Sequence, residues 1–230
     1  MDLSDKHLLV IGASGVLGGH IARQLQQAGA QVTGTARSEA SSARLDAGLA
    51  ERLLVDVEDS SSIRRLVDYL ASQQVDGIVN ATGVVGFGTP AETTPTDAAR
   101  LMQVNHLGPA ALITGLLPAL RVAAAAGRTP FLASITGVVA ERAFPGMSAY
   151  VASKSAHSAW LRALRLDLRR DGIRVLEARP GHTETGLASR AVFGAAPRFP
   201  AGMAPEHVAA VILRGIVDDA TELGSDAFTA

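Results

Sequence analysis

The chain of 230 residues contains no cysteine, only two tyrosines and, among its 21 basic residues, only two lysines. Without cysteine, disulfide bonds, thiolate catalysis and thiolate metal sites are excluded. The net charge of −1 and the scattered arginines give no electrostatic reason to expect binding to nucleic acid or to an anionic membrane. The six histidines occur singly, so no metal site is predicted.

A long apolar run is also missing from the start of the chain. Residues 1–6 are polar and the apolar segment that follows is short, so neither a signal peptide nor a membrane-spanning segment is expected. We therefore expect a cytoplasmic protein. The length suits one core, and apolar residues make up 47% of the chain, which predicts a single domain over residues 1–230.

Short apolar segments alternate with helical patterns along the whole chain. Apolar residues at helical spacing, such as Leu17, Ile21 and Leu25, or Trp160, Leu164 and Leu168, predict helices that each bury one face. The repeated β-α order predicts an α/β fold: a Rossmann-like doubly wound parallel sheet of six to seven strands with helices on both faces. The six expected strands cover residues 7–11, 31–35, 52–55, 76–80, 130–134 and 174–178.

Two irregular stretches, 84–96 and 186–204, are expected to be loops at the carboxyl edge of the sheet, where such folds bind ligands. The last helix is expected over 205–223, followed by at most a stub of a seventh strand near 226–229.

A glycine-rich turn, Gly12-Ala13-Ser14-Gly15-Val16-Leu17-Gly18, joins the first strand to the first helix. Gly12 permits a tight turn, Gly15 lets the backbone approach a pyrophosphate, and Gly18 lets helix and strand pack closely. The phosphates would then lie at the amino terminus of the helix. In this setting the turn predicts dinucleotide binding.

The second strand ends without the acidic residue that would bind the adenosine ribose of NAD. Arg37 stands there instead, with Ser38 or Thr35 able to add a hydroxyl. An arginine can pair with the 2′-phosphate of NADP, which makes NADP the expected cofactor and NAD the less favoured one. The alternative is a solvated arginine after a strand.

Tyr150 and Lys154 are four residues apart, one helical turn, so their side chains share a face. Chance would give such a pair in about 2% of chains with this composition. An ammonium beside a phenol favours the phenolate, which lowers the pKa of the tyrosine and makes it a usable proton donor. The alternative is a packed tyrosine with a solvated lysine beside it.

The glycine turn, Asn80-Ala81-Thr82-Gly83, Tyr150-Val151-Ala152-Ser153-Lys154 and Pro180-Gly181 with Thr185 together resemble the short-chain dehydrogenase/reductase family over nearly the whole chain. The resemblance implies that Tyr150 is the general acid/base and that Lys154 holds the nicotinamide ribose and tunes Tyr150. Asn105 matches the asparagine that keeps a water near the lysine. The family resemblance implies these cofactor contacts: Gly12, Ser14, Gly15, Val16, Leu17, Gly18, Arg37, Ser38, Asp56, Val57, Asn80, Ala81, Gly83, Tyr150, Lys154, Pro180, Gly181, Thr183 and Thr185.

The chain departs from the family pattern at the serine that orients the substrate carbonyl. That serine usually lies about thirteen residues before the tyrosine, where this chain has Gly137. Reading residues 134–137 as the family's Ser-x-x-Gly, with a longer loop after it, assigns the role to Ser134. Thr136 is the other candidate, because residues two apart on a strand face the same side.

The resulting prediction is an NADP(H)-dependent oxidoreductase that transfers hydride between the nicotinamide and a carbonyl or secondary alcohol. The expected substrate is an apolar small molecule, because the candidate pocket residues are mostly apolar: Val85, Phe87, Phe144, Met147, Leu187, Val192, Phe193 and Phe199. Two alternatives remain: a non-catalytic NADP(H)-sensing or interaction protein, and a nucleotide-sugar epimerase, which the glycine spacing suggests. The family resemblance also implies a homodimer through helices near 97–126 and 148–170, with a tetramer possible. Of the histidines, only His106 and His182 are expected near the cofactor.

Overall fold

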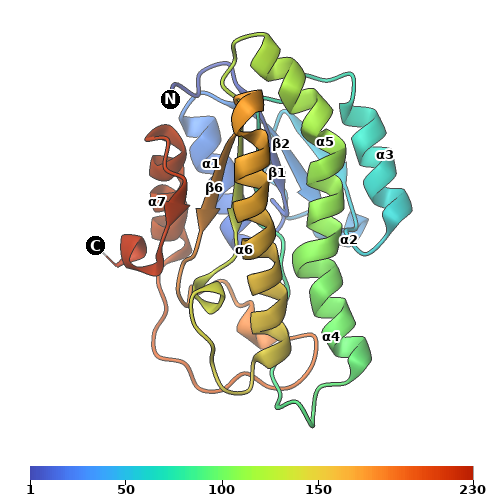
Figure 1. Ribbon diagram of the computed structural model, residues 1–230, viewed down its shortest axis with the longest axis vertical. Coiled ribbons are helices and arrows are strands. Elements are labelled where there is room, and N and C mark those ends of the chain that lie inside the picture. The colour runs from blue at the N-terminus through green and yellow to red at the C-terminus, as the bar shows by residue number, and fades with distance from the viewer. Residues whose placement is uncertain (230) are drawn as a thin grey trace.

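The computed structural model describes residues 1–229, which form one seven-stranded parallel sheet between two layers of helices (Figure 1). The order across the sheet is β3-β2-β1-β4-β5-β6-β7. Strands β1 to β3 are added toward one edge of the sheet and β4 to β7 toward the other, so the order switches between β1 and β4. This confirms the predicted fold class. The strands are β1 (His7–Ile11), β2 (Gln31–Ala36), β3 (Glu51–Leu54), β4 (Gly77–Asn80), β5 (Phe131–Ile135), β6 (Arg174–Ala178) and β7 (Glu222–Leu223).

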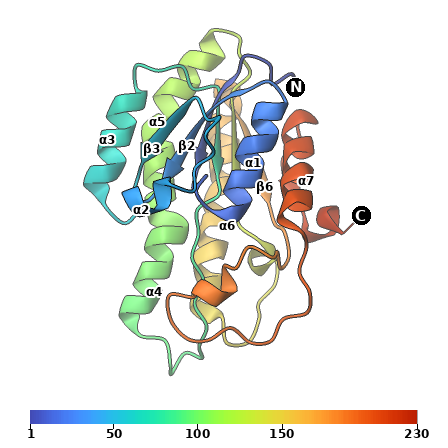
Figure 2. The ribbon, with the colours of Figure 1, turned by 180° about the vertical axis from the view of Figure 1, so that it is seen from behind.

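The helices divide between the two faces of the sheet. On one face lie α1 (Val16–Gln27) and α7 (Pro205–Val217), best seen in Figure 2. On the other lie α3 (Ser60–Leu70), α5 (Gly108–Ala125) and α6 (Ser148–Leu168), which Figure 1 shows in front. A short helix, α2 (Glu39–Ser42), follows β2, and α4 (Pro95–Met102) runs into α5 through the π-helical turn η1 (Gln103–Leu107).

The central strands are apolar on both faces, which is why they read as continuous apolar runs. In β1, Leu8 and Val10 pack toward α1 and α7, while Leu9 and Ile11 pack toward α3, α5 and α6. The alternation follows from the two-residue period of a strand. The two cores hold the sheet rigidly, so the loops at its carboxyl edge have fixed starting points.

Two sequence predictions about the elements are wrong in detail. The last helix ends at Val217 rather than near residue 223, because Asp219 adopts a left-handed backbone conformation (φ 61°) and the chain turns into β7. The seventh strand lies at 222–223, and Ser225–Phe228 is a 3₁₀ turn. In α6, the predicted stripe faces the core: Leu164 and Leu168 are buried with Leu161, and Trp160 packs against them while it stacks on His157.

The helical stretch Pro95–Ala125 is long and apolar enough, by length and composition alone, to cross a membrane. The expectation of no such segment rested only on the start of the chain. In the fold, α5 packs against α3 and α4 packs against α6, and 44% of the most apolar part of the stretch is buried. One face of α5 thus contributes to the core, through Leu112, Leu116 and Leu120 among others.

Candidate active site

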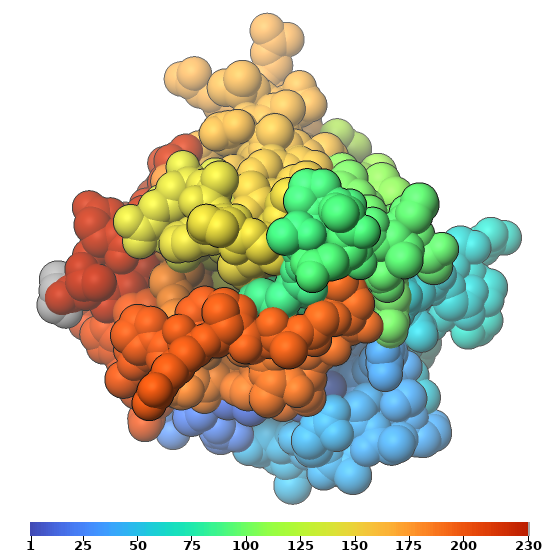
Figure 3. Space-filling view, turned by 90° about the horizontal axis from the view of Figure 1, so that it is seen from below, coloured from blue at the N-terminus to red at the C-terminus, as the bar shows by residue number. Residues whose placement is uncertain are grey.

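A pocket of about 520 Å³ opens at the carboxyl edge of the sheet. Its walls are the glycine turn before α1, the segments after β4, β5 and β6, and the first turns of α6. Figure 3 views this edge and shows the segment of residues 186–204, in orange, beside the loop between β5 and α6, in yellow, and the segment after β4, in green. The pocket therefore lies where parallel α/β sheets bind ligands.

The glycine turn is packed too closely for side chains at its first and last glycines. Gly12 has φ of +83°, and a Cβ at Gly18 would lie 2.3 Å from the Gly12 carbonyl oxygen. The Gly12 N–H donates to the Thr35 hydroxyl at 3.0 Å, and the Ser14 N–H donates to the Thr35 carbonyl at 3.3 Å. Thr35 is buried and holds the turn, so its hydroxyl does not reach the surface where it was predicted to meet a 2′-phosphate.

The structure brings most of the expected cofactor contacts into one pocket. Gly15 is the N-cap of α1 and has no side chain to accept a hydrogen bond from the first N–H groups of the helix. Residues 15–18 line the pocket, so these N–H groups can bind a pyrophosphate there. The residues present thus fit a dinucleotide. The predicted residues that line the pocket are Gly15, Val16, Leu17, Gly18, Ala81, Gly83, Tyr150, Lys154, Pro180, Gly181, Thr183 and Thr185.

The remaining predicted cofactor contacts support the pocket or lie beyond its end. Gly12, Ser14 and Asn80 stand behind its lining, and Asn80 accepts hydrogen bonds from the Thr82 N–H and hydroxyl. Asp56 follows β3, where one of its carboxylate oxygens accepts the Glu58 N–H at 2.9 Å. Val57 is buried, and its carbonyl accepts a hydrogen bond from Gln103.

A second arginine, Arg44, lies near the end of β2, where no sequence pattern marked it. Arg37 and Ser38 are exposed there, and Ser38 also caps α2 through Ser41. Arg44, just after α2, donates from Nε to the Ser14 carbonyl at 3.1 Å, which fixes its guanidinium beside the glycine turn. Within residues 1–229, Arg37 makes no ion pair. Two arginines thus follow β2, and one of them is bonded to the glycine turn.

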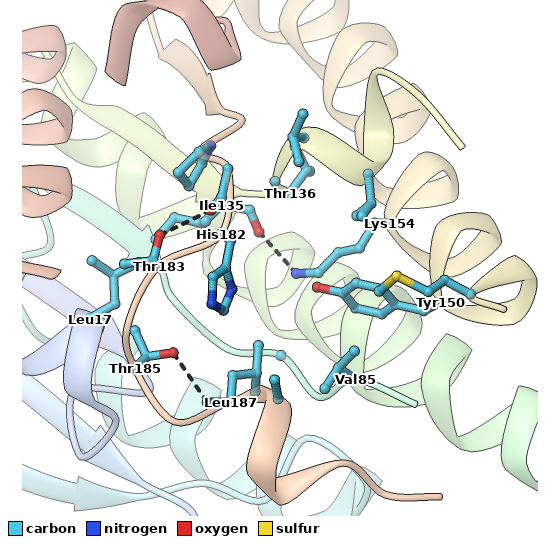
Figure 4. A pocket seen from close by; sticks show the side chains of 18 of the residues that line it. Leu17, Val85, Ile135, Thr136, Tyr150, Lys154, His182, Thr183, Thr185 and Leu187 are labelled. Carbon is cyan, nitrogen blue, oxygen red and sulfur yellow. Dashed lines mark hydrogen bonds between the residues drawn. The ribbon is translucent and has the colours of Figure 1, made fainter. Parts of the chain in front are cut away.

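Tyr150 and Lys154 project from α6 into the same space (Figure 4). Lys154 Nζ donates to the Ile135 carbonyl at 3.1 Å, and a Cβ built on Gly83 would lie 3.1 Å from Nζ. The glycine after β4 therefore leaves the space that the ammonium occupies. In Figure 4 the Tyr150 hydroxyl and the Lys154 ammonium lie side by side, on the wall of the pocket that α6 forms.

The pKa values of the pair differ from the sequence prediction. Burial raises the pKa of Tyr150 to about 12 and lowers the pKa of Lys154 to about 8, because each charged form loses hydration. The net pKa shift of Tyr150 is therefore upward, opposite to the predicted direction. With this pKa, Tyr150 is protonated at neutral pH and carries a proton that a substrate oxygen can accept.

Asn105 lies in the π-helical turn η1, which bends the path between α4 and α5. Its side chain is fully engaged: it accepts the Val84 N–H and donates to the Val84 carbonyl and to the Ser153 hydroxyl, each at 2.9 Å. Asn105 therefore joins the segment after β4 to α6, directly beside Lys154.

The structure does not bring Ser134 into the pocket. Ser134 is 0% exposed, accepts a hydrogen bond from Asn80 at 3.0 Å and lies 2.9 Å from His157 Nε2. β5 ends at Ile135, so Ser134 and Thr136 do not share a strand face as predicted. Thr136 lines the pocket, but its hydroxyl donates to Glu177 at 2.6 Å.

His157 continues the buried chain of hydrogen bonds away from the pocket. Burial, the nearby Lys154 charge and His106 lower its pKa to about 3, so the ring is neutral at physiological pH. Its Nδ1 lies 3.4 Å from the Nδ1 of His106. His106 thus belongs to this series of buried side chains and does not line the pocket, although it was expected near the cofactor.

The apolar wall of the pocket is largely as predicted. The predicted residues that line it are Val85, Phe87, Phe144, Met147, Leu187 and Phe199. Val192 and Phe193 pack behind them, where the Val192 N–H donates to the Val85 carbonyl. His182 lines the same pocket, together with the exposed Arg142 and Arg190.

A pocket that joins a dinucleotide-binding glycine turn to a buried tyrosine–lysine pair at the edge of a doubly wound sheet defines an NAD(P)-dependent oxidoreductase. The family model described as "short chain dehydrogenase" matches residues 6–192. The chain belongs to this family.

Individual relatives agree with this assignment. The chain is similar to the dehydrogenase/reductase SDR family protein 7-like of Anopheles gambiae, with 30% identity over 94% of this chain and 74% of the relative. In fold it is similar to a short chain dehydrogenase from Burkholderia cenocepacia J2315 in complex with NADP (TM-score 0.83, 21% identity, 99% of this chain and 91% of that one). It is also similar to the 3-ketoacyl-(acyl-carrier-protein) reductase from Brucella melitensis complexed with NADH (TM-score 0.86, 21% identity, 98% and 99%).

Proposed function

We propose that this protein is an NADP(H)-dependent oxidoreductase that interconverts a carbonyl group and a secondary alcohol on a largely apolar small molecule. The observation that carries the proposal is that Tyr150 and Lys154 line the same pocket as the glycine turn. A reduced nicotinamide, when bound, supplies the hydride that the carbonyl carbon accepts.

The chain's own residues supply proton transfer and position. As the carbonyl carbon accepts a hydride, Tyr150 donates its hydroxyl proton to the carbonyl oxygen. The C=O π bond is lost, a C–H and an O–H bond form, and the C–O single bond remains. In the reverse reaction the Tyr150 phenolate accepts the proton. Lys154 stays cationic through most of the physiological range, since its pKa is lowered only to about 8. Its charge stabilises the phenolate that forms when the proton leaves.

The preference for NADP over NAD is part of the proposal, and it rests on Arg37 and Arg44. Relatives of the same fold bind either cofactor. A charge-assisted hydrogen bond to a phosphate contributes about 1.5–3 kcal/mol, so Arg37→Ala and Arg44→Ala should each weaken NADPH binding roughly 10–100-fold. NADH binding should stay within about twofold of wild type, since NADH lacks the phosphate.

Cofactor titration by nicotinamide fluorescence measures both effects. Arg64→Ala, at an exposed position on α3, is the matched control for the loss of one positive charge. Equal losses of NADPH and NADH affinity in Arg37→Ala and Arg44→Ala would contradict the assignment of the phosphate to these side chains.

Turnover itself is tested with a panel of ketones, aldehydes and secondary alcohols of increasing apolar size, followed by NADPH absorbance. We expect reduction of apolar carbonyls, and Tyr150→Phe should lower kcat/KM by about 10²–10⁴ because the general acid is lost. The lining of Val85, Phe87, Met147 and Leu187 supports an apolar substrate.

One observation favours a second candidate, a protein that binds NADP(H) without turnover. The serine that orients the substrate in the family is buried away from the pocket at Ser134. NADPH binding without Tyr150-dependent oxidation of the cofactor across the panel would support this candidate.

We further propose a homodimer through the outer faces of α4–α5 and α6. Leu107 and Leu166 are 51% and 73% exposed on these helices, and the exposed face of α6 also carries the small residues Ala152, Ala159 and Ala163. Small side chains beside a leucine let two helices approach closely. Sedimentation velocity of wild type and Leu166→Glu tests this: the variant should dissociate, and a monomeric wild type would refute the proposal.

A further inference from the structure

The pocket needs a second hydrogen-bond donor for the substrate oxygen, and neither predicted hydroxyl can provide it. Ser134 is fully buried between Asn80 and His157, on the far side of the pocket lining. Thr136 donates its one proton to Glu177 at 2.6 Å. Developing negative charge on a carbonyl oxygen is best stabilised by preorganised donors, so this gap has a chemical consequence.

Thr136 is held in this orientation by a buried ion pair. Glu177 is 0% exposed and binds Arg179 Nη1 at 2.9 Å, while Arg179 also binds Glu141 and Glu222. Turning the Thr136 hydroxyl toward the substrate would remove a hydrogen bond from a buried carboxylate, which is unfavourable. The Thr136 hydroxyl therefore stabilises the buried Glu177 carboxylate and is not available to the substrate.

Two other threonine hydroxyls of the pocket also donate elsewhere, and a third, that of Thr185, is bonded as an acceptor. Thr82 donates to Asn80 at 2.6 Å, and Thr183 donates to the Gly181 carbonyl at 3.0 Å. Thr185 accepts the Leu187 N–H at 3.3 Å, and Figure 4 shows it across the pocket from Tyr150.

His182 is the polar side chain that faces the reacting centre. Figure 4 shows its ring in the pocket that Tyr150 and Lys154 enter from the opposite wall. The ring stacks on Phe199 with centroids 4.8 Å apart, and a Cβ built on Gly202 would lie 2.7 Å from its Cδ2. The stacking on Phe199 and the close approach of the Gly202 backbone hold the plane of the ring.

One nitrogen of His182 is available to a ligand. Nε2 lies 3.5 Å from Glu184 Oε1, within ion-pair range, whereas Nδ1 has no protein partner within residues 1–229. When Nδ1 carries a ring proton, it is a suitable donor to a carbonyl oxygen in a mostly apolar pocket.

We propose that His182 is a catalytic residue that donates the second hydrogen bond to the substrate oxygen, in the place that a serine hydroxyl fills in the family. His182 keeps its proton: the proton of the product alcohol comes from Tyr150, and the imidazole only stabilises the oxygen as its charge develops. The donor thus lies on the segment after β6, whereas the predicted hydroxyl lies at the end of β5. The inference rests on the proposed reductase function.

The test compares two substitutions of similar size. His182→Gln keeps an N–H donor and His182→Leu does not. With NADPH and a carbonyl that the wild type reduces, His182→Leu should lower kcat/KM about 10²–10³-fold, the usual effect of losing one such donor. His182→Gln should recover at least tenfold of that loss. Both variants should bind NADPH within threefold of wild type and show the same far-UV circular dichroism.

Three controls keep the outcomes distinct. His7→Gln, at the amino edge of the sheet, should behave as wild type. If the wild type and Tyr150→Phe differ in turnover but His182→Leu stays within threefold of wild type, or falls no further than His182→Gln, the assignment of His182 is refuted and the reductase function stands. A larger loss of kcat/KM in Thr136→Val than in His182→Leu would assign the second hydrogen-bond donor to Thr136 and refute the assignment to His182. If wild type reduces no carbonyl, both proposals fall.

Discussion

Gly18 is the position where the packing of the cofactor turn can be tested most simply. It lies inside α1, so in an unconstrained helix its replacement by alanine would stabilise the protein by about 0.5–1 kcal/mol. Here a Cβ would lie 2.3 Å from the Gly12 carbonyl oxygen and 2.9 Å from its carbon. Both neighbours are backbone atoms and cannot turn aside.

Gly18→Ala must therefore push α1 away from the glycine turn. Overpacking of this kind typically costs about 1–3 kcal/mol, which exceeds the gain in helix propensity. We expect a net destabilisation of about 1–2 kcal/mol, or a fall in Tm of about 2–8 °C for a domain of this size. NADPH affinity should fall as well, because the first turn of α1 moves away from the phosphates.

Gly19→Ala is the matched control, since it is the next residue of the same helix. Its Cβ would lie 3.3 Å from the Ala13 carbonyl oxygen, a tight contact that a small shift relieves. Thermal and urea unfolding of the two variants beside wild type decide the matter. If Gly18→Ala is as stable as Gly19→Ala and binds NADPH equally well, the close packing of helix and turn is not what requires glycine there.

Two further predictions follow from buried groups near the pocket. The pKa of His157 is lowered from 6.5 to about 3, so below pH 6.5 the unfolded chain binds a proton that the folded protein does not. Its contribution to stability is complete above pH 6.5 and should fall by roughly 2 kcal/mol by about pH 5. Urea unfolding against pH should show this slope in wild type and in a His20→Gln control but not in His157→Gln, and an unchanged slope would contradict it. The second prediction concerns Gly83→Ala, which would place a Cβ 3.1 Å from Lys154 Nζ. Because a flexible ammonium can move, we expect little change in Tm but a loss in kcat/KM of about tenfold or more. Wild-type kcat/KM in this variant would show that the position of the ammonium is not critical.

The features that the sequence predicted well are local in the chain. The β-α alternation defines the sheet because each short apolar run is followed by an amphipathic helix, and the glycine turn follows β1 directly. Tyr150 and Lys154 are one helical turn apart, so their shared face depends only on α6. None of these predictions depends on how distant segments are aligned.

The features that it missed depend on contacts between distant segments. Ser134 lies opposite Asn80 in the β4–β5 register, and this pairing, with His157 from α6, turns its hydroxyl away from the pocket. No local pattern marks that choice, because Ser134 and Thr136 look equivalent on a strand. Arg44 escaped notice because α2 is too short to leave a periodic signal.

His182 was noted only as a neighbour of the cofactor. Its orientation comes from Phe199 and Gly202, which lie about twenty residues further along in an irregular segment. The burial of Tyr150 likewise reverses the expected direction of its pKa shift, since the cost of desolvating a phenolate depends on the whole fold.

The central claim is that Tyr150 completes a hydride transfer at the pocket beside the glycine turn. The most direct measurement is isotope transfer: NADPH carrying deuterium at C4 is incubated with an apolar ketone, and the product is examined by mass spectrometry. The account predicts deuterium on the carbinol carbon with wild type, and loss of labelled product with Tyr150→Phe although NADPH still binds. Equal labelling by both proteins, or NADPH binding by wild type with no labelled alcohol, would contradict it.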